Sequence, residues 1–276
     1  MIKIRDFIFR TKLLRILIPI IKLLIIIKFN FINIKKSIIW LFKNSEFTNF
    51  FYEITPLNRN QMIGAISSIS YKSISEVEQY FSEIENDIEF KKDLETKSDR
   101  LPRSRELPTP IPLGRRVAWY ALIRIYKPKV VVETGTDKGI GSLVIQRALG
   151  KNGLGILYTL DIDRYSGSMF DESDLKKIKL LIGDSLEGIK NINDVDLFIH
   201  DSDHSAEHER NEYLAISPKL THNALVISDN SHVTDALFNW SKEKNRNFIF
   251  IKESPQNHWY QGGGVGISFI GDGGGS

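Results

Sequence analysis

The chain has 276 residues, of which 42% are apolar and 26% charged, and this suits one α/β domain of about 150–200 residues with an extension. It contains no cysteine, which excludes disulfides, thiolate nucleophiles and thiolate metal sites. The net charge is only +3, but the first 44 residues hold ten Lys or Arg and one acid. This basic end is therefore expected to meet an anionic surface.

Residues 1–44 are rich in Ile, Leu and Phe, and a Lys or Arg recurs every few positions. Because Arg15, Lys22 and Lys28 interrupt every run of about 20 residues, the pattern favours one or two amphipathic helices, bent near Pro19, at a membrane surface. The alternatives are a helix that packs on the domain or on a partner subunit, and a true membrane-spanning helix. We accordingly expect a cytoplasmic protein, peripheral on the inner face of the membrane.

Residues 45–114 are expected to form a helical extension that ends in a proline-rich linker or lid. A charged helix is predicted over 75–97, with Ser75 as its N-cap, because apolar residues recur there at steps of three and four. The stretch 101–114 holds four prolines, and another helix is predicted over 115–126.

Apolar strands alternate with helices over the domain predicted at 115–270, and 271–276 read as a flexible tail. This alternation predicts a largely parallel sheet with helices on both faces, whose ligands bind at the carboxyl ends of the strands. The predicted strands are 130–134, 155–162, 178–184, 194–201, 223–230, 247–253 and 264–270. Five acids stand at the strand ends, namely Glu133, Asp161, Asp184, Asp201 and Asp229.

The turn after the first of these strands reads ETGTDKGIG, and its glycine spacing differs from the GxGxxG dinucleotide fingerprint. Glu133 before the turn would repel a pyrophosphate, but it suits the cationic sulfonium and amino groups of S-adenosylmethionine. Asp161 suits the ribose hydroxyls of that cofactor, and Asp184 suits its adenine amino group. The predicted cofactor-binding residues are Glu133, Gly135, Thr136, Asp137, Gly139, Asp161, Asp184 and Asp201.

A candidate metal and catalytic site follows the next two strands, in the runs IHDSDHS and ISDN. Adjacent parallel strands would bring Asp201 beside Asp229 and Asn230, an all-oxygen set that suits Mg²⁺ or another divalent cation. His204, three residues past Asp201, is the predicted general base, and Asp201 is predicted to act with it. Alternatively, Asp229 and Asn230 only cap the next helix and His204 is a loop histidine. His200 is expected to pack on the other face.

The stretch from Arg115 to Phe269 resembles class I S-adenosylmethionine-dependent methyltransferases, especially the metal-dependent catechol and caffeoyl-CoA O-methyltransferase type and its bacterial relatives. ETGTDKG resembles the first cofactor motif, LDID the ribose motif, and HDSDH with SDN the metal motif. The resemblance implies a Rossmann-like, seven-stranded sheet of order 3-2-1-4-5-7-6 with an antiparallel seventh strand. His204 stands where the plant and animal enzymes carry a catalytic lysine.

The function expected is therefore O-methylation of a sugar, a glycan intermediate or a small aromatic molecule. His258, Trp259 and Tyr260 offer surfaces for such an acceptor, or they only anchor their loop. The alternatives are an NAD(P)-dependent oxidoreductase and a non-catalytic, membrane-tethered scaffold. Expected partners are the hydroxyl acceptor, a membrane surface through residues 1–44 and a second copy in a homo-oligomer. Nucleic acid is not expected, because basic and aromatic residues do not interleave in the domain.

Overall fold

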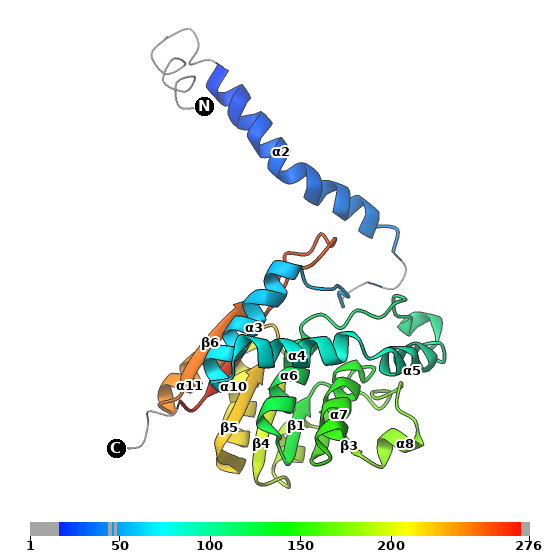
Figure 1. Cartoon of the computed structure of the whole chain (residues 1–276), viewed down its shortest axis with the longest axis vertical. Helices are drawn as coiled ribbons and strands as arrows, with labels where there is room; N and C mark the ends of the chain where they lie inside the picture. Colours follow the sequence, from blue (N-terminus) through cyan, green and yellow to red (C-terminus); the bar gives the residue numbers. More distant parts are fainter. Residues whose placement is uncertain (1–16, 44–45, 47–48, 272–276) are drawn as a thin grey trace. The chain divides into compact units, whose positions relative to one another are not determined.

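The computed structural model describes residues 17–43, 46 and 49–271. The chain divides into two compact units (Figure 1). One comprises Met1–Asn44 with Asn257–Tyr260, and the other comprises Ser45–Gln256 with Gln261–Ser276. The predicted tail at 271–276 lies almost wholly outside the described residues.

The smaller unit contains one long helix, α2 (Leu17–Trp40), none of whose residues is buried. Its apolar side chains surround the helix, since the stretch from Ile20 to Ile27 is interrupted only by Lys22, so α2 is less one-sided than the amphipathic prediction. By length and composition α2 could also cross a membrane, although signal sequences and core helices pass the same test. Pro19 lies in its first turn, where proline is tolerated, and the residues before Leu17 are outside the described part.

The same unit includes the short segment Asn257–Tyr260. In it the ring centroids of Trp259 and Trp40 are 5.1 Å apart, and the Trp259 ring also stacks near that of His258. This contact agrees with the reading in which Trp259 anchors its loop.

The larger unit begins with four helices, α3 (Pro56–Ser70), α4 (Ile74–Glu85), α5 (Ile88–Ser98) and α6 (Arg116–Tyr126), and a short 3-10 turn, η2 (Arg103–Arg105). The single helix predicted over 75–97 is wrong, because α4 ends at Glu85 and α5 begins at Ile88. The Asp87 carboxylate accepts a hydrogen bond from Phe90 N and so caps a new helix. Ser73, and not Ser75, is the N-cap of α4.

The sheet has seven strands in the order β3-β2-β1-β4-β5-β7-β6, and β7 is antiparallel to both neighbours, which confirms the predicted fold. The strands are β1 (Val130–Thr134), β2 (Ile156–Asp161), β3 (Ile178–Ile182), β4 (Val195–His200), β5 (Leu220–Ser228), β6 (Asn247–Lys252) and β7 (Gly264–Phe269). The helices among them are α7 (Ile140–Asn152), α8 (Glu172–Leu175), α9 (Ser185–Ile189), α10 (Ala206–Ile216) and α11 (Ala236–Glu243), with η3 (Ser217–Lys219).

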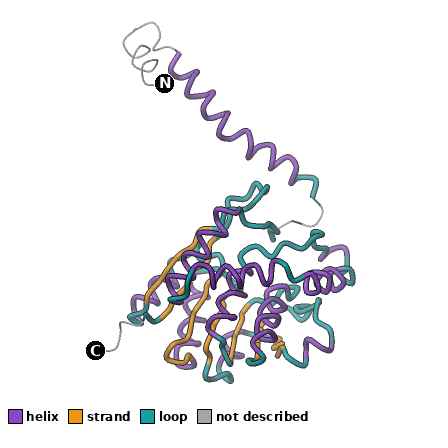
Figure 2. The backbone as a smooth tube through the Cα atoms, in the orientation of Figure 1, coloured by secondary structure: helices purple, strands orange, loops and turns teal. Residues whose placement is uncertain are grey.

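Helices cover both faces of the sheet (Figures 1 and 2), because each strand sends alternate side chains to opposite faces. Val131 belongs to the hydrophobic cluster that includes residues of α4, α6 and α7. Its neighbour Val132 belongs to the second cluster, which includes residues of α10 and α11. Strands that are buried on both faces have continuous apolar sequences, and the ends of these apolar runs therefore predict the ends of the strands.

The register brings the ends of neighbouring strands to one edge. Thr134 at the end of β1 pairs with Leu160 on one side and with His200 on the other. His200 in turn pairs with Ser228, so the residues that follow β1, β2, β4 and β5 emerge together. β6 runs parallel to β5, since both are antiparallel to β7, and its end lies at the same edge.

Candidate active site

The turn after β1 can be built only with glycine at two positions. Gly135 has φ +89°, and a Cβ there would lie 1.9 Å from the carbonyl oxygen of Asp201. Gly139 has φ +105°, and a Cβ there would lie 2.4 Å from the Phe170 ring. The turn therefore approaches the loop after β4 backbone to backbone, as in sites where the chain must pass close to a ligand or to another strand.

Asp161, at the end of β2, holds this turn in place. Its Oδ2 accepts hydrogen bonds of 2.9 Å from Thr136 N and from Asp137 N, and its Oδ1 accepts one from Asp163 N. The structure thus joins Asp161 to the turn that begins with Glu133, as the cofactor prediction requires. Ribose binding by Asp161 remains a prediction.

Glu133 is turned into the protein beneath the turn and is 1% exposed. Its Oε2 accepts hydrogen bonds from the hydroxyls of Ser142 and Thr159, and a Cβ at Gly141 would lie 2.6 Å from its Oε1. Burial raises the pKa of Glu133 to about 7, although the two hydroxyl bonds act in the opposite direction. A cationic ligand nearby would favour the ionised form.

Asp184 and Asp137 are more exposed than Glu133. Asp184 is the N-cap of α9, and its Oδ1 accepts a hydrogen bond from Leu186 N. Asp137 lies 3.5 Å from Arg105, whose Nη1 also donates to Tyr165 O. The proline-rich segment that carries Arg105 therefore reaches across the turn, which is consistent with the predicted lid. The ends of β1, β2 and β3, with these acids, are called the cofactor half below.

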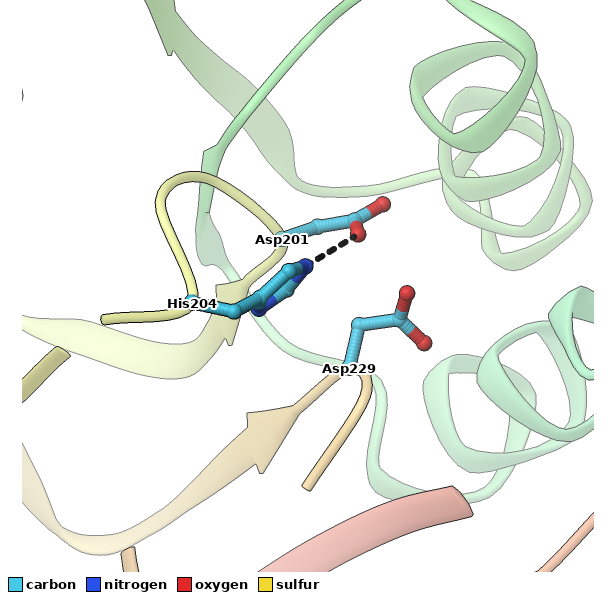
Figure 3. Close-up of side chains that lie close together, drawn as sticks. All are labelled: Asp201, His204 and Asp229. Atoms are coloured by element: carbon cyan, nitrogen blue, oxygen red, sulfur yellow. Dashed lines mark ion pairs between the residues drawn. The ribbon is translucent and has the colours of Figure 1, made fainter. Parts of the chain in front are cut away.

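The other predicted acids meet at the ends of β4 and β5 (Figure 3). One ligand atom from each of Asp201, His204 and Asp229 lies within 4.8 Å of the other two. His204 Nε2 is 4.0 Å from Asp201 Oδ1 and 3.1 Å from Asn230 Nδ2. Asn230 has φ +49°, a conformation that asparagine tolerates. The structure brings His204 together with the two carboxylates, and Asn230 contacts the imidazole. A role of Asn230 as a metal ligand remains a prediction.

The charges of these groups depend on one another. Burial and the negative charge of Asp229 raise the pKa of Asp201 well above its usual range. Burial would raise the pKa of Asp229 as well, but the positive charges of Arg115 and Arg116, together with a hydrogen bond to Asp201, outweigh burial and hold that pKa low. Burial lowers the pKa of His204, so its imidazole is neutral near pH 7 and able to accept a proton.

Three residues at this edge were missed by the sequence analysis. Arg115, at the start of α6, pairs through Nε and Nη2 with both carboxylate oxygens of Asp229. Glu253 follows β6, is 1% exposed, and accepts a hydrogen bond of 2.5 Å from Tyr52 OH. The rule of an acid after each strand could have found Glu253. No pattern marked Arg115 or Tyr52. We call Arg115, Asp201, Asp229 and Glu253 the acid–arginine centre.

A buried polar network supports the loop after β4 from the opposite side. His200 is fully buried, as predicted, and its Nδ1 lies 2.7 Å from Glu212 Oε2. Glu212, on α10, also accepts hydrogen bonds from Thr134 Oγ1 and Ser185 Oγ. His208 joins the same carboxylate at 3.0 Å. Glu212 thus ties β1, β4, α9 and α10 together beneath Asp201, and it fixes the backbone from which Asp201 projects.

Residues 132–231 match the family described as a methyltransferase domain. Over this range the chain carries a methyltransferase domain. The match spans β1 to the end of β5, and it therefore includes both the cofactor half and the loops that carry Asp201 and Asp229. No curated protein matches the chain.

Solved structures share the fold of this methyltransferase domain. A Klebsiella pneumoniae protein provisionally named an O-methyltransferase aligns with a TM-score of 0.51 at 15% identity, covering 67% of this chain and 91% of that one. Cofactor-bound Rv0187 from MTB aligns with a TM-score of 0.50 at 14% identity, covering 68% of this chain and 93% of that one. At such identities the likeness concerns the fold alone.

Proposed function

We propose that the chain is an O-methyltransferase that transfers the methyl group of S-adenosylmethionine to a hydroxyl of a sugar, a glycan intermediate or a small aromatic molecule, assisted by a divalent cation. The observation that carries this proposal is the meeting of Asp201, His204 and Asp229 within 4.8 Å, beside the glycine turn of the methyltransferase domain. Two carboxylates for a cation and a neutral imidazole for a proton are what hydroxyl activation requires.

The cofactor would bind along the turn after β1. Glycine at position 135 lets this turn approach the loop after β4 so closely that a Cβ would overlap the carbonyl oxygen of Asp201. Asp161 orients the backbone of the turn through Thr136 N and Asp137 N. The remaining acceptor capacity of Asp161 suits ribose hydroxyls, and Glu133 supplies a negative charge beneath a sulfonium. The bound cofactor supplies an electrophilic methyl group.

A divalent cation fits the donor set of Asp201 and Asp229, because hard cations prefer carboxylate oxygens. The Asp229 side chain is buried, and Arg115 contacts both of its carboxylate oxygens, so a positive charge is already accommodated beside this carboxylate. Asn230 or His204 would complete the protein ligands. A bound cation would lower the pKa of an acceptor hydroxyl and hold its oxygen for attack.

His204 is the proposed general base. Its neutral imidazole would take the proton of the acceptor hydroxyl at Nε2, while the oxygen forms a bond to the methyl carbon and the carbon–sulfur bond breaks. Asn230 Nδ2 contacts the same Nε2 at 3.1 Å and so orients the ring until an acceptor arrives. If His204 is instead a cation ligand, another group must accept the proton.

A dinucleotide-dependent oxidoreductase is the less favoured reading. Such enzymes place a pyrophosphate over the first glycine turn, where backbone N–H groups at a helix start receive it. In this chain Thr136 N and Asp137 N already donate to Asp161, and Glu133 lies beneath the turn. Both features disfavour an anionic ligand there.

The test uses the purified full chain with radiolabelled S-adenosylmethionine and a panel of glycosides and catechols, with Mg²⁺ or with EDTA. We expect label in an oxygen-linked methyl group, and a loss of about a hundredfold in kcat for His204→Gln. His222→Gln, an exposed histidine in the first half of β5, is the matched control and should retain activity. Transfer only to nitrogen or carbon would contradict O-methylation.

We also propose that residues 1–44 hold the enzyme at the cytoplasmic face of a membrane. The support is the apolar surface of α2, none of whose residues is buried, together with the basic residues that flank and interrupt it. The full chain should sediment with vesicles that contain anionic lipid. A variant lacking residues 1–44 should stay in solution and still methylate a water-soluble acceptor. Equal sedimentation of both forms would contradict this role.

A further inference from the structure

The place of a cation beside Asp229 is taken by an arginine of the same chain. Arg115 Nη2 donates to Asp229 Oδ2, and Arg115 Nε pairs with Asp229 Oδ1. Nη2 also lies 4.0 Å from Asp201 Oδ1. The guanidinium thus faces both predicted carboxylate ligands, and the Trp119 ring lies 5.8 Å from its central carbon.

Arg115 and a divalent cation cannot both contact the Asp229 carboxylate closely. They would compete for the same two oxygens of Asp229, and their like charges would repel each other in a poorly hydrated site. The Asp229 side chain is 0% exposed, so water can do little to screen that repulsion. Any cation that binds Asp229 therefore has to move the guanidinium away.

We propose that Arg115 is a built-in counter-ion of Asp229, that a divalent cation binds the centre by displacing it, and that Arg115 thereby sets the metal affinity of the enzyme. The inference rests on the metal assistance in the proposed function, and it names the residue that controls it. Without metal, Arg115 neutralises Asp229 and stabilises the fold. With metal, it has to find another carboxylate.

Glu253 is placed to receive the displaced guanidinium. Its Oε1 lies 3.7 Å from Arg115 Nε, and it is buried with no hydrogen-bond partner among the described residues. Its Oε2 is already held by Tyr52 OH at 2.5 Å and by Gly263 N at 3.2 Å. The carboxylate is thus fixed by one oxygen and open at the other, on the side of Arg115.

The test measures Mn²⁺ binding to the full chain by electron paramagnetic resonance, without substrate. Arg115→Met should bind Mn²⁺ about tenfold more tightly than the wild type or better, because the competing charge is gone. Arg124→Met is the matched control, since it removes an equal charge from the same helix, where the ion pair of Arg124 is with Glu83 and not with the acid–arginine centre. It should change the affinity by less than about threefold.

Stability gives a second readout that does not depend on activity. Metal-free Arg115→Met leaves Asp229 buried without its counter-ion, so its Tm should fall and Mn²⁺ should raise it more than in the wild type. If this variant does not fold, Arg115→Lys replaces it. A lysine keeps the charge but cannot contact both oxygens of Asp229, so an affinity gain of about threefold is expected.

Glu253→Gln probes the second position of the arginine. Because the displaced guanidinium would lose its carboxylate, Mn²⁺ affinity should fall about threefold to tenfold in this variant. In the Arg115→Met background, adding Glu253→Gln should leave the Mn²⁺ affinity unchanged. Equal Mn²⁺ affinity of the wild type and Arg115→Met would overturn the role of Arg115 and leave metal-assisted methylation intact. Absence of Mn²⁺ binding in every variant, with O-methylation that persists in EDTA, would overturn metal assistance as well.

Discussion

The two halves of the active edge collect acids in the same way and neutralise them differently. In the cofactor half, Asp161 accepts hydrogen bonds from three backbone N–H groups, and Glu133 accepts from two hydroxyls. In the acid–arginine centre, Asp229 faces a full positive charge on Arg115. Neutral dipoles that belong to the backbone cannot leave, whereas a side-chain cation can be exchanged.

This difference indicates that the two halves bind different kinds of ligand. Fixed dipoles shape a permanent surface for a ligand that binds in one way, as the cofactor is expected to do. An exchangeable counter-ion leaves the other half able to accept a metal and a charged or polarised acceptor oxygen.

The largest effect is expected from Asp229→Asn. The variant removes the charge that pairs with Arg115, and kcat for methyl transfer should fall about a hundredfold or more. Cofactor affinity, measured by calorimetric titration, should stay within about threefold, because Asp229 makes no described contact with the turn after β1.

Asp194→Asn is the matched control for this charge. Asp194 is exposed at the opposite edge of the sheet and has φ +54°, which asparagine also adopts readily. It should retain wild-type kcat. A kcat for Asp229→Asn within about threefold of the wild type would show that the acid–arginine centre is structural.

The next effect concerns the pH dependence of stability through Glu133. Burial raises its pKa from 4.5 to about 7, so the folded protein disfavours the ionised form that the unfolded chain adopts above 4.5. Below pH 4.5 Glu133 is protonated in both states and does not change the free energy of unfolding. Between pH 4.5 and 7 it lowers the free energy of unfolding progressively, by roughly 3 kcal/mol in total.

Glu133→Gln should lack this decline. Urea unfolding of the cofactor-free protein at pH 5 and pH 8 should show the variant gaining stability relative to the wild type as the pH rises. S-adenosylmethionine should bind more weakly to the variant at pH 8, where the wild type offers a carboxylate. Parallel pH profiles for the two proteins would contradict the raised pKa.

The positions of the strands could be predicted from the sequence, because strands buried on both faces are short apolar runs that end at a charge. Val130–Thr134 was predicted to the residue, and the strand order followed from the resemblance. The single helix over 75–97 was wrong because its apolar periodicity continues through Asn86, and only the local hydrogen bond of Asp87 starts a second helix.

The acid–arginine centre could be predicted only in part. Asp201 and Asp229 follow adjacent parallel strands, so local sequence fixes their approach. Arg115 is 114 positions from Asp229 and lies on a helix whose packing angle no local pattern determines. Tyr52 comes from a segment without any periodic signal, 201 positions from Glu253. The position of a strand end depends on local sequence, whereas the residue that neutralises an acid there depends on how distant segments pack together.

A smaller effect is expected from Gly135→Ala, which adds a methyl group between the two halves. The positive φ and the overlap with Asp201 O should cost about 1–3 kcal/mol of stability and weaken cofactor binding. Gly150→Ala is the matched control, because Gly150 lies within α7 with no atom within 4 Å of an added Cβ. It should gain about 0.5–1 kcal/mol. Unaltered stability in Gly135→Ala would contradict the close approach of the two loops.

The smallest effect is expected from Asp184→Asn in the cofactor half. Oδ1 of Asp184 accepts a hydrogen bond from Leu186 N, and an asparagine would cap α9 equally well through the same atom. The fold should therefore be unchanged. The second carboxylate oxygen is the one predicted to accept from the adenine amino group, and in asparagine it becomes an NH₂ group that can only donate.

Asp184→Asn should accordingly bind S-adenosylhomocysteine about threefold to tenfold more weakly than the wild type, by calorimetric titration. The inosine analogue, which carries an oxo group in place of the amino group, should reverse this order, because the new NH₂ can donate to the oxo group. Such a reversal cannot come from damage to the helix cap, which would weaken both ligands alike. If both ligands bind the two proteins equally, Asp184 only caps α9, and the cofactor half recognises its ligand without this acid.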